Sequence, residues 1–271
     1  MKIKIHLTLS KALFAVLSLC SLFALANPKE ARAEVKELEL SHIADYEEYK
    51  PESGNLELSP NKEYKLIIDA DNVEINTIKA NTFVISQSSG IKLTIEGNSD
   101  NSDYTLTCNK IADINNLVIN SGKIKVNVQI DCYNLMITGG SLEVERDGGT
   151  GIWVENEMII KGGKVISHCT GGGGIDVTNK LLISGGDVDV YGTFGISMGY
   201  RGKLEISGKE TKVKASGYKY NYGRGGIAIL GGIQEQGAEL KLVKPVKISA
   251  PEGGCSYIRQ CSPGLWFNDN L

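Results

Sequence analysis

The chain has 271 residues, of which 32 are glycine, and its 29 basic and 32 acidic side chains give a formal net charge of −3. An acidic, glycine-rich surface argues against nucleic-acid binding, which needs a basic face. The length suits one domain or one elongated array of repeats.

The first residues match the plan of a secretory signal peptide. Residues 1–11 carry three lysines, residues 12–26 are almost wholly apolar or small, and Ala24-Leu25-Ala26 matches the pattern of a cleavage site. The apolar run is shorter than the roughly 20 residues that a membrane-spanning helix needs. We therefore predict a signal peptide over 1–26 and a secreted or cell-surface protein, periplasmic if the cell is Gram-negative, with no membrane span after cleavage.

A charged segment over 27–60 is predicted to cap the repeats that occupy the middle of the chain. It contains Glu47-Glu48 and is broken by the sequence Pro51-Glu52-Ser53-Gly54. The open end of a repeat array needs a polar covering element, and this composition provides one.

A repeated phrase dominates residues 61–250. The pattern Leu-x-Ile-x-Gly-Gly begins at Leu135, at Met158 and at Leu181, and a shortened copy begins at Leu204, each 23 residues after the one before. A fixed period of roughly 20–50 residues is typical of solenoids and related arrays.

Each period holds three short strands separated by turns. In one unit the first strand is Ile152-Trp153-Val154, the second is Met158-Ile159-Ile160 and the third is Val165-Ile166. Apolar alternation in short runs bounded by glycine and polar residues indicates strands rather than helices. We predict an all-β parallel β-helix, a solenoid with three short strands and about 23 residues per coil and with coils stacked about 4.8 Å apart.

The alternation also predicts which side chains face the core and which face outward. Alternate apolar residues of all three strands should point inward and form the core. The outward positions of the second strand form an apolar stripe on neighbouring coils: Val118, Met136, Ile159 and Leu182. Either another segment of the chain covers this stripe, or it is a partner face.

The C-terminal tail, 251–271, is predicted to cover the last coil, because uncovered strand edges invite aggregation. It contains Cys255 and Cys261, which are close enough in sequence to form a disulfide in an exported protein. The three remaining cysteines of the mature chain are Cys108, Cys132 and Cys169. The first two lie 24 residues apart and could stack on neighbouring coils, or all three could be buried free thiols.

Aromatic residues at outward positions and turns suit the apolar faces of sugar rings. The candidate contacts are Trp153 and Asp176 on the first strands, Tyr191 in a turn, and the tyrosines of an insertion: Tyr218, Tyr220 and Tyr222. Packing of these rings on the coil surface is the alternative.

Acidic turns offer oxygen ligands for calcium, with Asp100 and Asp103 as the candidates, although solvated turns explain the same residues. Signatures of catalysis are sparse. His168 and Cys169 are adjacent, so on a strand they would point to opposite faces. No catalytic residue is assigned, and the chain is more simply understood without enzymatic activity.

The phrase Gly-Ile-x-Val followed by Leu-x-Ile-x-Gly-Gly-x-Val-x-Val resembles the exported right-handed β-helix carbohydrate-binding domain proteins of anaerobic bacteria. It is carried by Gly151 to Val165, by Gly174 to Val190 and by Gly195 to Ala215. The resemblance implies a right-handed helix, binding to plant cell-wall polysaccharide, and calcium in aspartate-rich turns.

The leading hypothesis is an exported, non-catalytic protein that binds carbohydrate or a cell-surface polysaccharide, with no cofactor except possible calcium. The first alternative is a surface adhesin or structural module that binds a protein partner through the apolar stripe. The second is a polysaccharide lyase or hydrolase.

Overall fold

The computed structural model describes the chain from residue 34 onward in segments. The described residues are 34–71, 73–81, 89–98, 104–199, 202–208, 211–217, 227–229, 239–242 and 247–249. Contacts divide the chain into Met1–Glu34 and Val35–Leu271, and the strands and their pairing belong to the second unit. The predicted signal peptide and C-terminal tail, including Cys255 and Cys261, lie outside the described residues.

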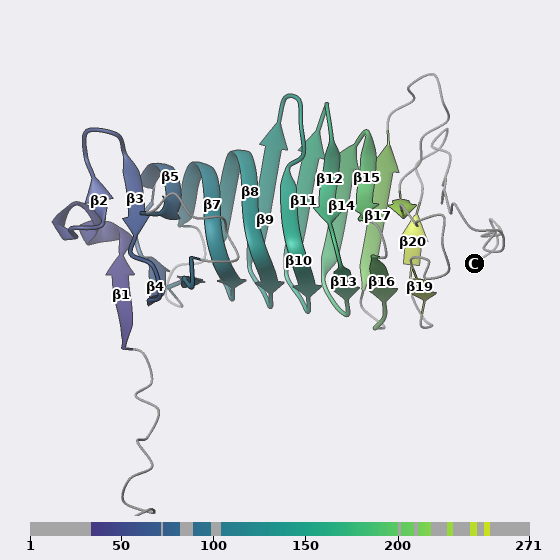
Figure 1. Cartoon of the computed structure of the whole chain (residues 1–271), viewed down its shortest axis with the longest axis horizontal. Coiled ribbons are helices and arrows are strands. Elements are labelled where there is room, and N and C mark those ends of the chain that lie inside the picture. The colour runs from purple at the N-terminus through teal and green to yellow at the C-terminus, as the bar shows by residue number, and fades with distance from the viewer. Residues whose placement is uncertain are drawn as a thin grey trace, which may run out of the picture. The chain divides into compact units, whose positions relative to one another are not determined.

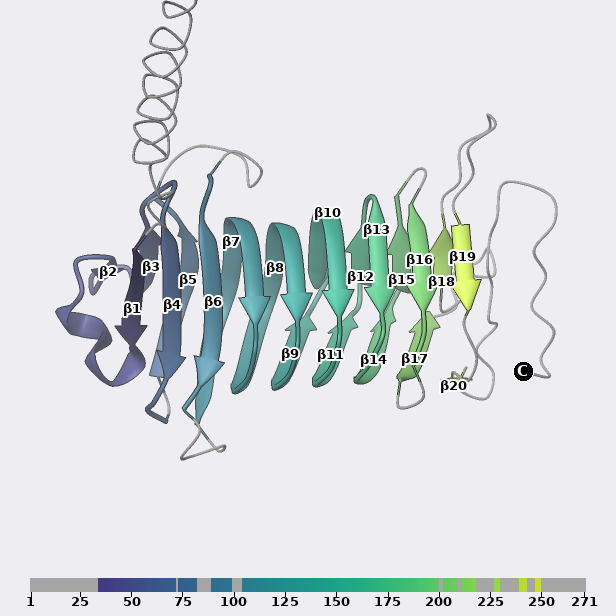
Figure 2. The ribbon, with the colours of Figure 1, turned by 90° about the horizontal axis from the view of Figure 1, so that it is seen from below.

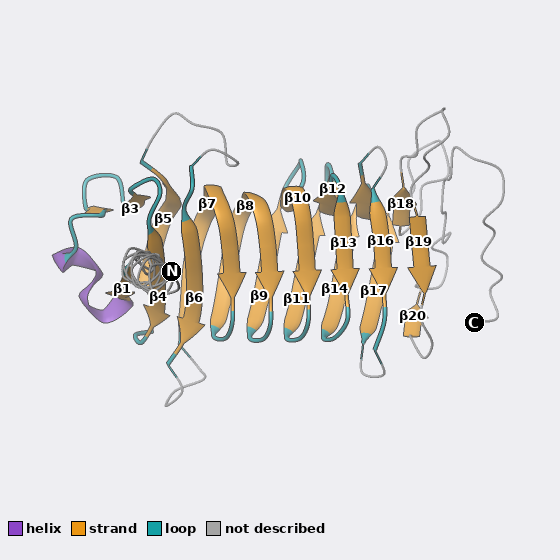
Figure 3. Ribbon diagram, turned by 60° about the horizontal axis from the view of Figure 1, so that its bottom comes forward, coloured by secondary structure: helices purple, strands orange, loops and turns teal. Residues whose placement is uncertain are grey.

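The described chain is almost entirely strand, with one short 3-10 helix, η1, at Leu40–Asp45 (Figure 3). The strands are β1 Val35–Glu39, β2 Tyr49–Lys50, β3 Asn55–Leu58, β4 Glu63–Ile68, β5 Val73–Ala80, β6 Lys92–Gly97, β7 Thr105–Ile119, β8 Lys123–Ile137, β9 Ser141–Arg146, β10 Ile152–Ile160, β11 Lys164–Cys169, β12 Gly173–Val177, β13 Lys180–Ile183, β14 Asp187–Gly192, β15 Phe194–Met198, β16 Lys203–Ile206, β17 Lys212–Gly217, β18 Ile227–Ile229, β19 Glu239–Leu242 and β20 Lys247–Ser249.

All of these strands belong to one long sheet, and each described pairing except β2–β3 is parallel (Figure 1). Apart from β2, the strands pair with the equivalent strand segments of neighbouring repeats, and one repeat is called a coil below. The prediction of an all-β protein is confirmed, and this long parallel sheet is compatible with an all-β solenoid.

The pairing forms three columns. In the second-strand column, Leu135 pairs with Met158, Met158 with Leu181, and Leu181 with Leu204, so the four copies of the repeated phrase are stacked in register. Figure 2 shows β10, β13, β16 and β19 side by side in this column. The first-strand column contains the middle of β8 and the start of β10, followed by β12 and β15. The third-strand column contains β9, β11, β14 and β17.

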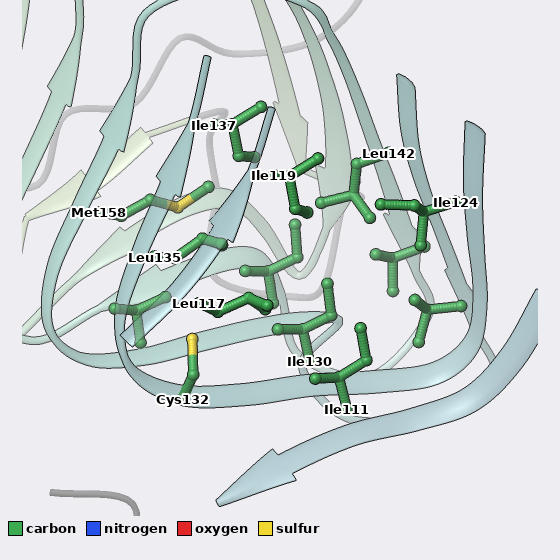
Figure 4. Close-up of a cluster of buried hydrophobic side chains, with 14 of the residues drawn as sticks. Ile111, Leu117, Ile119, Ile124, Ile130, Cys132, Leu135, Ile137, Leu142 and Met158 are labelled. Carbon is green, nitrogen blue, oxygen red and sulfur yellow. The ribbon is translucent and has the colours of Figure 1, made fainter. Parts of the chain in front are cut away.

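The core lies between the three columns, and the predicted alternation is confirmed. Side chains from each column meet in one buried cluster, as Ile130, Leu135 and Leu142 do in Figure 4. Full burial of such a side chain contributes roughly 1.5–3 kcal/mol. The inward residues that the alternation assigns are at most 1% exposed: Ile152, Val154, Ile175, Val177, Ile196, Met198, Leu135, Ile137, Leu181, Ile183, Leu204, Ile206, Leu142, Val144, Val188 and Val190.

Part of the segment predicted as a cap, residues 27–60, belongs to the parallel strand columns. β1 pairs in parallel with β4, and β3 pairs with β5, so parallel pairing starts at Val35 rather than near residue 61. The sequence did not predict β1, because three of its five residues are charged and it buries only Leu38. η1 and the antiparallel β2 lie beyond it, and Glu48, 3% exposed, accepts hydrogen bonds of 2.6 and 2.8 Å from the ammonium of Lys36.

Cys108, Cys132 and Cys169 are free, buried thiols, as one of the two alternatives predicted. Cys108 pairs in register with Val126 of the third-strand column, whereas Cys132 pairs with Val154 of the first, so the two do not stack. Burial raises the pKa of the Cys108 thiol to about 12, which keeps it protonated and unreactive.

An asparagine ladder links four successive coils at the corner before the second strands. Asn134 donates to Asn116 (2.9 Å), Asn156 donates to Asn134 (2.8 Å), and Asn179 donates to Asn156 (3.0 Å). The amides of Asn134 and Asn156 both donate and accept, which joins coils whose backbones already pair.

Asn134→Asp is expected to lower the free energy of unfolding by about 1–3 kcal/mol at neutral pH, because two acceptor oxygens then face each other at Asn116. Urea titration measures the loss. A protonated aspartic acid can donate, so the deficit should narrow below about pH 4. Equal stability of the two proteins at pH 7 would contradict a structural role for the ladder.

Candidate functional site

The outward face of the first-strand column brings an exposed indole together with two carboxylates. Because Ile152 and Val154 are buried, Trp153 points outward, and it is 40% exposed. It pairs in register with Asp131 on the preceding coil and with Asp176 on the following coil. We call these three side chains the Asp-Trp-Asp row.

Partial burial sets the electrostatics of both carboxylates. Desolvation raises the pKa of Asp176, opposed by a hydrogen bond from the Ser197 hydroxyl on the next coil. Desolvation also raises the pKa of Asp131; Lys110 opposes this shift, and the charges of Asp113 and Glu155 add to it. Both carboxylates are therefore held in an environment that disfavours their negative charge.

Asp176→Asn is expected to make the protein more stable at neutral pH. Because the folded-state pKa of Asp176 is raised above 3.8, stability falls as the pH rises through that pKa, and the penalty is absent well below 3.8. The variant should therefore unfold at a higher urea concentration than the parent at pH 7, and the two should converge near about pH 3. A difference that does not change with pH would contradict the assignment.

Tyr191, another predicted contact, lies on a different column. It pairs in register with His168 of the third-strand column, and the two rings meet edge to face with centroids 6.2 Å apart. Both line an open pocket of about 530 Å³ where the strands of this column end. The other lining residues are Asn127, Glu145, Arg146, Asp147, Cys169 and Thr170. His168 is exposed and Cys169 is buried, so the prediction that their side chains point to opposite faces of the strand is confirmed.

The structure thus joins Trp153 and Asp176 and places Tyr191 apart from them. Tyr218, Tyr220, Tyr222, Asp100 and Asp103 lie outside the described residues. Sequence reasoning missed Asp131, because its strand reads Gln129-Ile130-Asp131-Cys132 and lacks the glycine of Gly-Ile-x-Val. Alignment on the alternation alone, Ile-x-Cys with Ile-x-Val, would have found it.

The apolar stripe is present as a continuous row. Val118 pairs with Met136, Met136 with Ile159, and Ile159 with Leu182. All four side chains are partly exposed, while their sequence neighbours are buried. The row ends at Glu205 on the next coil.

Within the described residues, one group has metal-ligating atoms close together: Glu39, His42 and Asp69. The Asp69 carboxylate already accepts hydrogen bonds from the amide and hydroxyl of Ser41, at 2.8 and 2.5 Å.

Among the residues that the structure describes, no helix combines the length and the apolar character needed to cross a bilayer.

Comparison with known proteins found no matching family model, no matching curated protein and no matching solved structure.

Proposed function

We propose that the chain is an exported, non-catalytic, right-handed parallel β-helix that binds carbohydrate or a cell-surface polysaccharide on the outward face of its first-strand column. The stacked registers at 23-residue steps support three strands per coil. Right-handedness is supported by the general rule for parallel strands joined by crossovers, which holds in about 98% of cases.

The Asp-Trp-Asp row is the observation on which the binding proposal rests. An indole offers a flat apolar face to the C–H surface of a sugar ring, and carboxylates accept hydrogen bonds from its hydroxyls. Trp153 is exposed, whereas Asp131 and Asp176 are partly buried, so the ring stands forward with acceptors on both sides. Backbone pairing holds all three in place, which limits the entropy lost on binding.

Truncation of the indole tests the proposal. Trp153→Ala is expected to weaken retention on the bound polysaccharide by about tenfold or more, because it removes the stacking surface. Affinity electrophoresis against a panel of plant and microbial polysaccharides measures retention. Val128→Ala is the matched control, since Val128 is 39% exposed and lies outside the row.

Retention of the parent protein by no polysaccharide, or equal retention of Trp153→Ala, would overturn the proposal. Because the side chain is exposed, the substitution should leave the fold intact, and circular dichroism verifies this.

The register of the apolar stripe supports a second candidate function, binding of a protein partner. Four partly exposed apolar side chains in one row form a contiguous surface of the kind that interfaces use. Leu182→Glu would place a charge at the last position of the row, directly beside Ile159, while leaving the buried Leu181 unchanged. Light scattering and cross-linking should then show loss of an oligomer or complex that the parent forms; a monomeric parent that cross-links to nothing would count against this candidate.

A further inference from the structure

The Asp-Trp-Asp row has the chemistry of a receptor for positive charge. We propose that it selects polysaccharides that carry protonated amino groups, such as glucosamine polymers, over neutral and anionic ones. This inference rests on the proposed carbohydrate-binding function and specifies the substrate class of the same site.

The first argument is the unbalanced charge of the carboxylates. The side-chain contact that favours ionised Asp176 is a neutral hydroxyl, that of Ser197. For Asp131 the favourable cation is Lys110, which is opposed by Asp113 and Glu155. Desolvated carboxylates with incomplete compensation gain more from a cationic ligand than from a hydroxyl.

The second argument is the indole between them. A cation over the face of a tryptophan is attracted by the ring quadrupole, and tryptophan is the most favourable ring for this interaction. The 40% exposure of Trp153 leaves its ring accessible to a ligand. A sugar that carries an ammonium group can therefore stack its C–H face on the ring and place its charge near either carboxylate.

The third argument is spacing. Asp131 and Asp176 belong to coils on either side of Trp153, so their strands lie about 10 Å apart at two inter-strand spacings. One bound metal ion is too small to contact both carboxylates. A polymer with an ammonium group on each unit can satisfy both at once, and lying along the row also gains from multivalency.

The same charges disfavour acidic polymers. Asp113 and Glu155 add negative potential around Asp131, so the carboxylates of a uronic-acid chain would meet like charge in a partly desolvated site. Neutral glucose chains can stack on Trp153 but leave the excess charge of the site uncompensated.

Calorimetry with four oligosaccharides of equal length tests the inference: β-1,4-linked glucosamine, its fully N-acetylated form, β-1,4-linked glucose, and galacturonic acid. At about pH 6, where the amines are largely protonated, the glucosamine oligomer is expected to bind at least about tenfold more tightly than the other three. Its affinity should fall as salt rises, because the added attraction is ionic.

Variants separate charge from stacking. Asp176→Asn should lower the affinity for the glucosamine oligomer by about fivefold and leave that for the glucose oligomer within about twofold. Asp187→Asn is the control for net charge, because Asp187 is exposed on the third-strand column, and it should change neither affinity. Trp153→Ala should weaken both.

The failure of the inference and the failure of the proposed function give different results. If the glucose, N-acetylated or galacturonate oligomer binds as tightly as glucosamine, or if Asp176→Asn leaves glucosamine binding unchanged, the selectivity is overturned while carbohydrate binding stands. If none of the four oligomers binds, and the polysaccharide panel is not retained either, both are overturned.

Discussion

Leu181→Asp is expected to unfold the protein, whereas the same substitution at the next residue, Leu182→Asp, is expected to leave it folded. Leu181 is fully buried and pairs in register with Met158 and Leu204, which are also fully buried. Burial of a carboxylate there, without a partner, costs several kcal/mol, comparable with the roughly 5–15 kcal/mol by which most domains are stable.

Leu182 is also a leucine, but its side chain projects from the opposite face of the strand. It is partly exposed in the apolar stripe, so a carboxylate at this position keeps most of its hydration. Circular dichroism and urea titration of both variants measure the contrast. Equal losses of stability would contradict the difference in burial between the two side chains. A greater loss for Leu182→Asp would mean that the alternation is shifted by one residue, since such a slip exchanges the two faces of a strand.

Gly163→Ala is expected to destabilise the protein by about 3 kcal/mol or more, well beyond the cost of the same change at Gly148. Both glycines have positive φ, +80° at Gly163 and +75° at Gly148. A Cβ atom at Gly163 would lie 2.7 Å from the backbone carbon of Gly139 and 2.7 Å from the backbone oxygen of Gly140, both in the preceding coil. At Gly148 it would meet nothing within 4 Å.

The control variant Gly148→Ala should cost only the backbone strain, about 1–2 kcal/mol. The difference between the two variants in urea titration then measures how tightly successive coils stack at the glycine turn. Equal losses at the two positions would mean that conformation alone, and not stacking, requires glycine at Gly163.

The fold prediction rested on two local features of the sequence: the glycines of the repeated phrase and the alternation of apolar side chains along each strand. The second glycine of the repeated phrase has positive φ in three copies, at Gly140, Gly163 and Gly186. A turn conformation and the inward direction of alternate side chains depend on each residue and its immediate neighbours, which explains why the core prediction was confirmed.

Coil-to-coil contacts were harder to predict. The second-strand column is built with steps of 24 residues from Leu93 to Leu117 and 18 from Leu117 to Leu135, and both pairings remain in register because the turns absorb the difference. The strand around Asp131 lacks the glycine of the repeated phrase, so its place beside Trp153 depends on how these turns close. The asparagine ladder depends on the same stacking.

The sequence by itself determined the all-β class, the 23-residue step, the inward residues and the outward positions that do not belong to the core. Only the tertiary structure decided which of those outward residues meet: Trp153 stands between Asp131 and Asp176, while Tyr191 lies with His168 on another column. The physical reason is the length of chain that determines each feature. Strand alternation and glycine turns are properties of a few consecutive residues, whereas neighbours on adjacent coils are fixed by the closure of a whole turn of chain.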